Sequence, residues 1–215
     1  RTKYSAGMTQ TQLIWIRTAQ QSRSQKTLER LLDATEQLLE SRPFEAITVQ
    51  QIVKTGHSSV GSFYARFGDK SALLQVLHQR FCSDVMETAK LFSSGITEHT
   101  DLKSLIEVFS ELMLTDLRER PGLRRAFLVA RPNDAHFQRR THAVDAHLCS
   151  ILEPLLETVQ DEIGHADLHQ ATLFAFEIAN SIAEYRLLYG VQQDFGPGFR
   201  TEMVRAILGY LTQPA

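Results

Sequence analysis

Four consecutive small or short side chains form a surface that another molecule could approach closely. They are Ser59, Val60, Gly61 and Ser62, at the expected start of a short helix. Glycine and serine are poor residues for a helix interior, so this turn favours close approach over helix stability. The free N–H groups in the first turn of a helix also suit a phosphate. The segment therefore predicts binding chemistry rather than catalysis.

Few other residues could form a catalytic or metal site. The stretch from Gly56 to Gly61 is similar to the G-x-S-x-G turn of hydrolases, but its second glycine comes one residue late and no strand precedes it. No glycine motif for nucleotide phosphates is present. His165 and His169 share a helix face, although solvated histidines are the favoured interpretation of that spacing. We expect no enzymatic activity, no metal and no cofactor.

The composition is typical of a folded, water-exposed protein. The chain has 215 residues, of which 43% are hydrophobic and 22% charged, with only 11 Gly and 6 Pro. No uncharged apolar run approaches the roughly 20 residues of a membrane-spanning helix. The two cysteines, Cys82 and Cys149, lie too far apart for a zinc ribbon and do not suggest a disulfide scaffold. With no apolar signal segment at the start, we expect a cytoplasmic protein that does not contact membranes.

The formal charge of −2 is unevenly distributed along the chain. Residues 1–80 contain 11 Lys and Arg against six Asp and Glu, a charge of +5, whereas the remainder contains 12 and 19, a charge of −7. A basic first third suggests that this part alone meets a polyanion. Chance scatter of surface charge is the alternative.

The hydrophobic spacing predicts an all-α fold. Residues 1–23 are interpreted as an arm that is flexible or only locally helical, and helical periodicity begins at Ser24. Pro43 ends the first helix, and Thr48, Ser59 and Asp69 are expected to cap the next three. Later helices are expected near 101–118, 122–131, 134–163, 167–190 and 199–212, with a kink at Pro154. The predicted domains are the arm, a unit over 24–80 and a helical unit over 81–215.

The three helices within 24–80 have the spacing of a helix-turn-helix unit. Spacing alone would fit an ordinary helical hairpin equally well. Together with the small residues from Ser59 to Ser62, the pattern favours a DNA-binding head.

This region resembles the DNA-binding domain of TetR-type transcriptional regulators. The most specific part is Ser59-Val-Gly-Ser-Phe-Tyr-Ala-Arg-Phe-Gly-Asp-Lys70, and the resemblance extends over 24–80. The chain has Pro43 where the family usually has Gly, and its turn reads Gly-His-Ser-Ser instead of Ala-Gly-Val-Ser. Either His57 adopts the left-handed conformation in this turn or Gly56 does so after a small shift.

The resemblance implies a role for particular residues. Thr48, Tyr64 and Lys70 would contact DNA phosphates, and Ser59, Val60, Gly61 and Ser62 would lie in the major groove. Arg23 and Lys26 are candidates for a further contact from the arm. The alternatives are a half-buried core ring for Tyr64 and a solvated charge for Lys70.

The resemblance also implies a C-terminal domain for effector binding and dimerisation. Dimerisation would use the last two helices, where Ala171, Ala175, Ala179 and Ala183 recur every four residues and where Met203, Val204, Ile207, Leu208 and Leu211 form an apolar face. The alternative is that the alanine stripe packs only within the chain. Candidate residues of an effector pocket are Phe109, Met113, Phe127, His147, Phe174, Glu177 and Asn180.

The sequence thus predicts a homodimeric regulator that binds a palindromic operator in double-stranded DNA. Repression relieved by a small-molecule effector is the favoured mechanism. One alternative is a DNA-binding factor without an effector. The other is a helical enzyme or binding protein whose helix-turn-helix is incidental.

Overall fold

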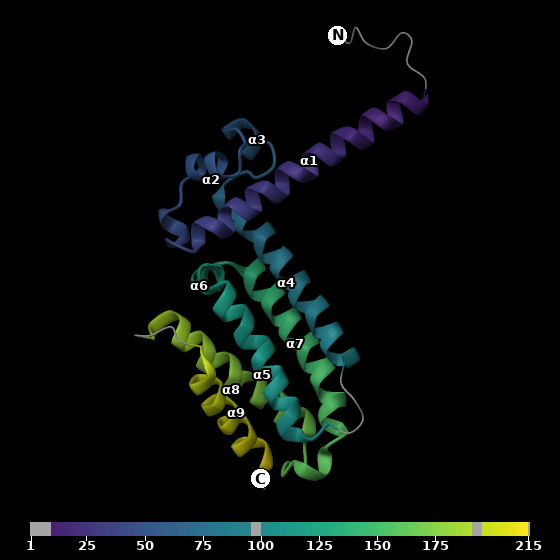
Figure 1. The fold of residues 1–215 in the computed structure, drawn as a ribbon, viewed down its shortest axis with the longest axis vertical. Coiled ribbons are helices and arrows are strands. Elements are labelled where there is room, and N and C mark those ends of the chain that lie inside the picture. Colours follow the sequence, from purple (N-terminus) through teal and green to yellow (C-terminus); the bar gives the residue numbers. More distant parts are fainter. Residues whose placement is uncertain (1–9, 96–99, 191–194, 215) are drawn as a thin grey trace. The chain divides into compact units, whose positions relative to one another are not determined.

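The fold is helical throughout the residues that the structure, a computed structural model, describes (10–95, 100–190 and 195–214). Within these ranges there are only α-helices, short 3-10 helices and connecting turns (Figure 1). The contacts divide the chain into two compact units, one up to Leu73 and one from Leu74 onward. The predicted all-α class is confirmed.

The first unit begins with a helix that is longer than expected. Helix α1 spans Gln10–Leu39, so residues 10–22 are helical instead of forming an arm. This stretch contains no Gly or Pro, and four of its 13 residues are Gln, which loses little conformational freedom in a helix. The part of the predicted arm over residues 1–9 lies outside the described residues.

Three short elements follow α1 in the first unit. A 3-10 helix η1 (Phe44–Ala46) comes directly after Pro43, and α2 (Val49–Thr55) and α3 (Val60–Tyr64) form the helix-turn-helix. The core beneath them contains Leu31 from α1, Ile52 from α2 and Phe63 from α3, all fully buried. The helix-turn-helix is therefore anchored on the long first helix.

The second unit is built from the remaining long helices. They are α4 (Lys70–Gly95, whose first turn belongs to the first unit), α5 (Leu102–Glu119), α6 (Pro121–Ala130), α7 (Ala135–Glu157), α8 (Leu168–Tyr189) and α9 (Pro197–Thr212), with 3-10 turns η2 (Arg131–Asn133) and η3 (Gln160–Glu162). Asp101, Asp134 and Asp167 cap three of these helices by accepting backbone N–H bonds. Helix α7 continues through Pro154 but ends at Glu157, six residues before the predicted end.

The alanine stripe of α8 belongs to the core of the second unit. Ala171, Ala175, Ala179 and Ala183 are all buried within the single chain, and α8 packs against both α7 and α9. The apolar face of α9, with Met203 and Ile207, is buried in the same core, while Leu208 is half-buried. The alanine stripe therefore packs within the chain, as in the alternative interpretation of the sequence, and the buried part of the α9 face does the same.

Among the described residues, no helix is both long enough and apolar enough to span a bilayer.

Candidate nucleic-acid interface and ligand cavity

Helix α2 begins at Thr48 with a complete capping box. The Thr48 hydroxyl accepts a hydrogen bond from the Gln51 backbone N–H at 3.2 Å, and the Gln51 side chain accepts one from the Thr48 N–H at 2.8 Å. Both bonds satisfy N–H groups that the helix itself leaves unpaired. Thr48 is exposed, so its backbone and side chain are fixed at the surface of the first unit.

In the turn between α2 and α3, His57 and not Gly56 adopts the left-handed conformation. His57 has φ of 48°, whereas Gly56 has φ of −80°. Gly56 is needed for a different reason, because a Cβ there would lie 3.0 Å from the Arg30 carbonyl oxygen and 3.3 Å from the Ala34 Cβ. The glycine therefore permits close packing of α2 on α1, and His57 carries the backbone strain.

One face of helix α3 is exposed, and the other is buried in the core of the first unit. The Ser59 hydroxyl caps it by accepting from the Ser62 N–H at 3.1 Å. Val60 and Tyr64 are 41% and 55% exposed, whereas Phe63 between them is fully buried. A Cβ on Gly61 would meet only the Ser59 hydroxyl, at 4.0 Å. The predicted contact residues thus share an open, unobstructed surface, and Tyr64 is not the half-buried core ring of the alternative.

Lys70 does not reach outward as expected. Its ammonium donates to the carbonyl oxygens of Phe44 and Ile47 at 2.8 Å each and of Glu45 at 3.2 Å. The Nζ atom also lies 4.6 Å from the centre of the Phe44 ring. Burial lowers the pKa of Lys70, although the nearby Glu45 carboxylate opposes this. With its three protons donated to the chain, Lys70 is positioned to hold η1 against the start of α4.

Arg66 supports the interface and was missed from sequence. Its guanidinium donates to the Ser62 carbonyl at 2.8 Å and reaches Ser24 of α1 at 3.4 Å. It therefore ties the end of α3 to the first helix. Only the three-dimensional placement of Ser24 identifies this role. Of the two arm candidates, Lys26 is exposed on α1, and the Arg23 side chain lies outside the described residues.

The second unit contains a cavity of about 190 Å³. Helices α4 to α8 all contribute side chains to its wall. Four predicted pocket residues line it: Phe109, Met113, Phe127 and Asn180.

The other three predicted pocket residues lie elsewhere. His147 and Glu177 are exposed, and Phe174 is 44% exposed with its ring against Tyr210. None of the three is among the residues that line the cavity. On α8 the lining follows Phe176, Asn180 and Glu184 at intervals of four residues.

Charged residues that the sequence did not single out line one part of the cavity. Arg131 makes a two-pronged contact with Glu184 at 2.9 and 2.7 Å. Arg120 pairs with Asp116 at 2.6 Å and with Asp84 at 3.4 Å. Glu184 follows the predicted pocket residue Asn180 by one helical turn, and this spacing could have identified it as a lining residue from the sequence.

His78 and Cys82, on consecutive turns of α4, form an uncharged part of the wall. His78 is stacked on Phe137, and its Nδ1 lies 3.3 Å from the Arg140 guanidinium. Burial, reinforced by the charge of Arg140, lowers the pKa of His78 to about 4. Burial raises the pKa of Cys82 to about 11. At neutral pH the imidazole is therefore neutral and the thiol is protonated.

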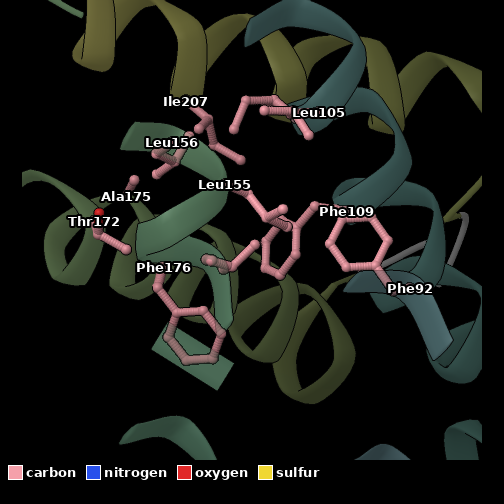
Figure 2. A pocket seen from close by; sticks show the side chains of 11 residues that line it. Phe92, Leu105, Phe109, Leu155, Leu156, Thr172, Ala175, Phe176 and Ile207 are labelled. Carbon is pink, nitrogen blue, oxygen red and sulfur yellow. The ribbon is translucent and has the colours of Figure 1, made fainter. Parts of the chain in front are cut away.

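A second, smaller cavity of about 20 Å³ extends the apolar part of this space. Figure 2 shows its lining, which is hydrocarbon except for the Thr172 hydroxyl. The Thr172 hydroxyl donates to the Leu168 carbonyl at 2.8 Å, so it is already satisfied. Phe92, Phe109, Leu152 and Phe176 line both cavities.

No cluster of three or more metal-ligating side chains occurs in the described part of the chain. The two histidines considered as metal ligands from the sequence contact other groups. His165 hydrogen-bonds the Tyr210 carbonyl at 2.8 Å, and His169 contacts Glu153 at 2.9 Å.

Two family models match the sequence. The model for bacterial regulatory proteins of the tetR family matches residues 31–77, which include the helix-turn-helix. The model for the tetracyclin repressor-like C-terminal domain matches residues 101–211, which include most of the cavity wall. No curated protein matches the sequence.

Solved structures share the fold at low sequence identity. A TetR transcription regulator from Haloarcula marismortui superposes with a TM-score of 0.68 at 16% identity, covering 86% of this chain and 96% of that one. Salmonella enterica GusR gives 0.62 at 18% identity, covering 87% and 96%. The reduced form of E. coli NemR gives 0.62 at 17% identity, covering 88% and 99%.

Proposed function

Because the chain belongs to the tetR family of bacterial regulatory proteins, we propose that it represses transcription from a palindromic operator until a small molecule occupies its cavity. The observation that carries the DNA-binding part is the outward face of α3. There Val60 and Tyr64 are exposed around Gly61, while buried Phe63 fixes the helix from behind. A protein acting on chromosomal DNA in this way would work in the cytoplasm.

The proposed DNA contacts divide between bases and phosphates. Ser59, Val60, Gly61 and Ser62 read base edges in the major groove, and Thr48 and Tyr64 contact phosphates. Lys26 and Arg23 add contacts from α1. We assign Lys70 to support of η1 instead, since a phosphate contact would require it to release the three carbonyls that it binds.

An exposed apolar stripe on α8 supports a homodimer. Phe174, Ile182, Tyr185 and Tyr189 are 44%, 37%, 68% and 71% exposed, and their spacing places them on one side of the helix. Such a stripe suits a two-fold interface, in which the same surface of each copy meets its equivalent. The dimer contact through α8 and α9 would then use this stripe, because the alanine stripe is already buried.

The cavity supports an effector in preference to the effector-free alternative. A space of about 190 Å³ walled by five helices can couple to DNA binding if occupancy changes the separation of the two DNA-binding heads. Two heads that read successive major grooves must stand about 34–36 Å apart. An effector that favours another separation would release the operator.

Selection of random duplex DNA by the purified protein, repeated at several salt concentrations, tests this function. We expect a palindrome whose half-sites are about one helical turn apart. Val60→Ala should change the preferred bases, and Val129→Ala is the matched control, since Val129 is 47% exposed on α6. Recovery of no common sequence, together with binding that does not depend on salt, would contradict the proposal.

A further inference from the structure

The charged side chains of the large cavity gather toward one end, beside Phe81 and Phe127, and the other end is apolar. Along α7 its lining runs from Asp145 to Leu152, and along α8 it runs in the opposite sense, from Glu184 to Phe176. The other charged lining residues are Asp84, Asp116, Arg120, Arg124 and Arg131, toward the polar end. The apolar end contains Phe92, Phe109 and Leu152, which it shares with the smaller cavity. Figure 2 shows Phe92 and Phe109 in the wall of the smaller cavity. An occupant that satisfies both ends must be elongated, with a polar head and an apolar tail.

The charges of the lining are almost fully paired with one another. Glu184 is paired with Arg131. Asp116 lies 2.6 Å from Arg120 and 3.6 Å from Arg124, and Asp84 lies 3.4 Å from Arg120. The lining as a whole holds four carboxylates and three guanidinium groups, and His78 is neutral at physiological pH. One carboxylate is therefore in excess.

That carboxylate is Asp145. Among the residues that the structure describes, its side chain accepts no hydrogen bond and makes no ion pair, although it is half-buried in the wall. Burial, followed by the charge of Glu184, raises the pKa of Asp145, and the charges of Arg131, Arg124 and His142 oppose this without reversing it. A half-buried carboxylate is stabilised by a cation or an N–H donor placed beside it.

Arg124 is a weaker anchor for an anionic head. Its guanidinium lies 5.0 Å from the centre of the Phe81 ring and shares Asp116 with Arg120. An anion would have to compete with Asp116 for the Arg124 guanidinium. A cation beside Asp145 would contact a carboxylate that has no ion pair among the described residues.

We propose that the cavity binds an amphiphile with a basic nitrogen, whose cationic head meets Asp145 and whose hydrocarbon or aromatic tail lies among Phe92, Phe109 and Phe176. This inference rests on the proposed role of the cavity as the effector site, and it specifies the chemical class of the effector. The aromatic rings at the tail end provide the apolar surface for the hydrocarbon or aromatic part of such a molecule.

Titration calorimetry of the full chain with three matched probes tests the proposal. Decylammonium, decanoate and decanol share one tail and differ only in the charge of the head. We expect decylammonium to bind at least about tenfold more tightly than decanoate, a difference that one charged hydrogen bond can supply. Tighter binding of decanoate or decanol, or binding of none of the three, would overturn the proposal.

A variant assigns the preference to the proposed residue. Asp145→Asn keeps the size of the side chain and should lose most of the preference for decylammonium, while Asp161→Asn, at an exposed aspartate of η3, should retain it. An unchanged preference in Asp145→Asn would also overturn the proposal. The wild-type comparison of the three probes stands even if that variant fails to fold. Because these experiments contain no DNA, failure of decylammonium to release DNA would count against the proposed function alone.

Discussion

At the scale of single residues, close packing and positive φ fall on two different residues in the turn of the helix-turn-helix. Gly56 is required because a Cβ would meet the Arg30 carbonyl, whereas His57 occupies the left-handed position. The sequence raised both possibilities for this turn, and only the backbone angles decide between them.

Substitutions at these two positions should have opposite effects on stability. His57→Gly should raise the free energy of unfolding by about 0.5–1 kcal/mol, because glycine adopts positive φ without strain. Gly56→Ala should lower it by about 1–3 kcal/mol through the clash with α1. Urea denaturation of the two variants beside the wild type provides the measurement. Equal effects of the same sign would show that the turn is not strained at His57.

His78 should make the protein sensitive to mild acid. Its pKa of about 4 lies below the ordinary value of 6.5, so the unfolded chain takes up a proton on acidification before the folded protein does. The free energy of unfolding should therefore fall as the pH falls, by about 2 kcal/mol between pH 7 and pH 5. Arg140, Arg124 and Arg131 face the imidazole and disfavour its protonation, and Asp134 opposes them.

Urea denaturation at the two pH values measures this effect. His78→Gln has no titrating side chain there and retains an acceptor for Arg140, so its stability should change much less over the same range. If wild type and variant lose stability equally, another group is responsible for the acid sensitivity.

At the scale of elements, Lys70 connects the start of α4 to η1. Removing its ammonium leaves three carbonyl groups without their charged donor. Lys70→Ala should therefore lower the free energy of unfolding by about 1–3 kcal/mol. The control is Lys54→Ala, at an exposed lysine in the last turn of α2, which should change stability by less than about 0.5 kcal/mol.

The salt dependence of DNA binding distinguishes the two roles considered for Lys70. If it supports η1, the slope of log affinity against log salt should stay the same in Lys70→Ala. Loss of a phosphate contact would instead reduce the slope by about one unit with stability unchanged. That second outcome would restore the interpretation drawn from the sequence.

Helix starts could be predicted where a side chain marks them. Thr48, Ser59 and Asp69 each accept the capping hydrogen bond expected from the sequence. The start of α1 could not be placed, because no breaker separates residues 10–22 from Ser24.

The cavity was predicted only in part, because helical periodicity does not say which face of a helix turns toward its neighbours. Phe176 and Asn180 face the cavity, while Glu177 beside them faces outward. Asp145 could not be recognised from sequence at all, since its lack of a hydrogen-bond or ion-pair partner among the described residues depends on Arg131 pairing with Glu184 instead.

At the scale of the whole molecule, dimerisation through the exposed stripe of α8 has a direct test. The double variant Tyr185→Asp, Tyr189→Asp should sediment as a monomer, because two carboxylates would be buried in the interface without partners. It should also lose tight binding to a palindromic site, since a single head contacts only one half. Leu91→Asp is the control, at a leucine of α4 that is 67% exposed. A dimer that persists in the double variant would place the interface elsewhere.

The buried alanines of α8 also determine how freely this helix can change in a mutational scan. Ala179 and Ala183 are 0% and 2% exposed, so any side chain larger than serine must displace a neighbouring helix. Tyr185 and Tyr189 are exposed in the single chain, so other side chains fit at these two positions without displacing a helix. A library selected only for folded monomer should therefore hold the alanines nearly constant while the tyrosines vary, and selection for DNA binding should then restrict the tyrosines as well.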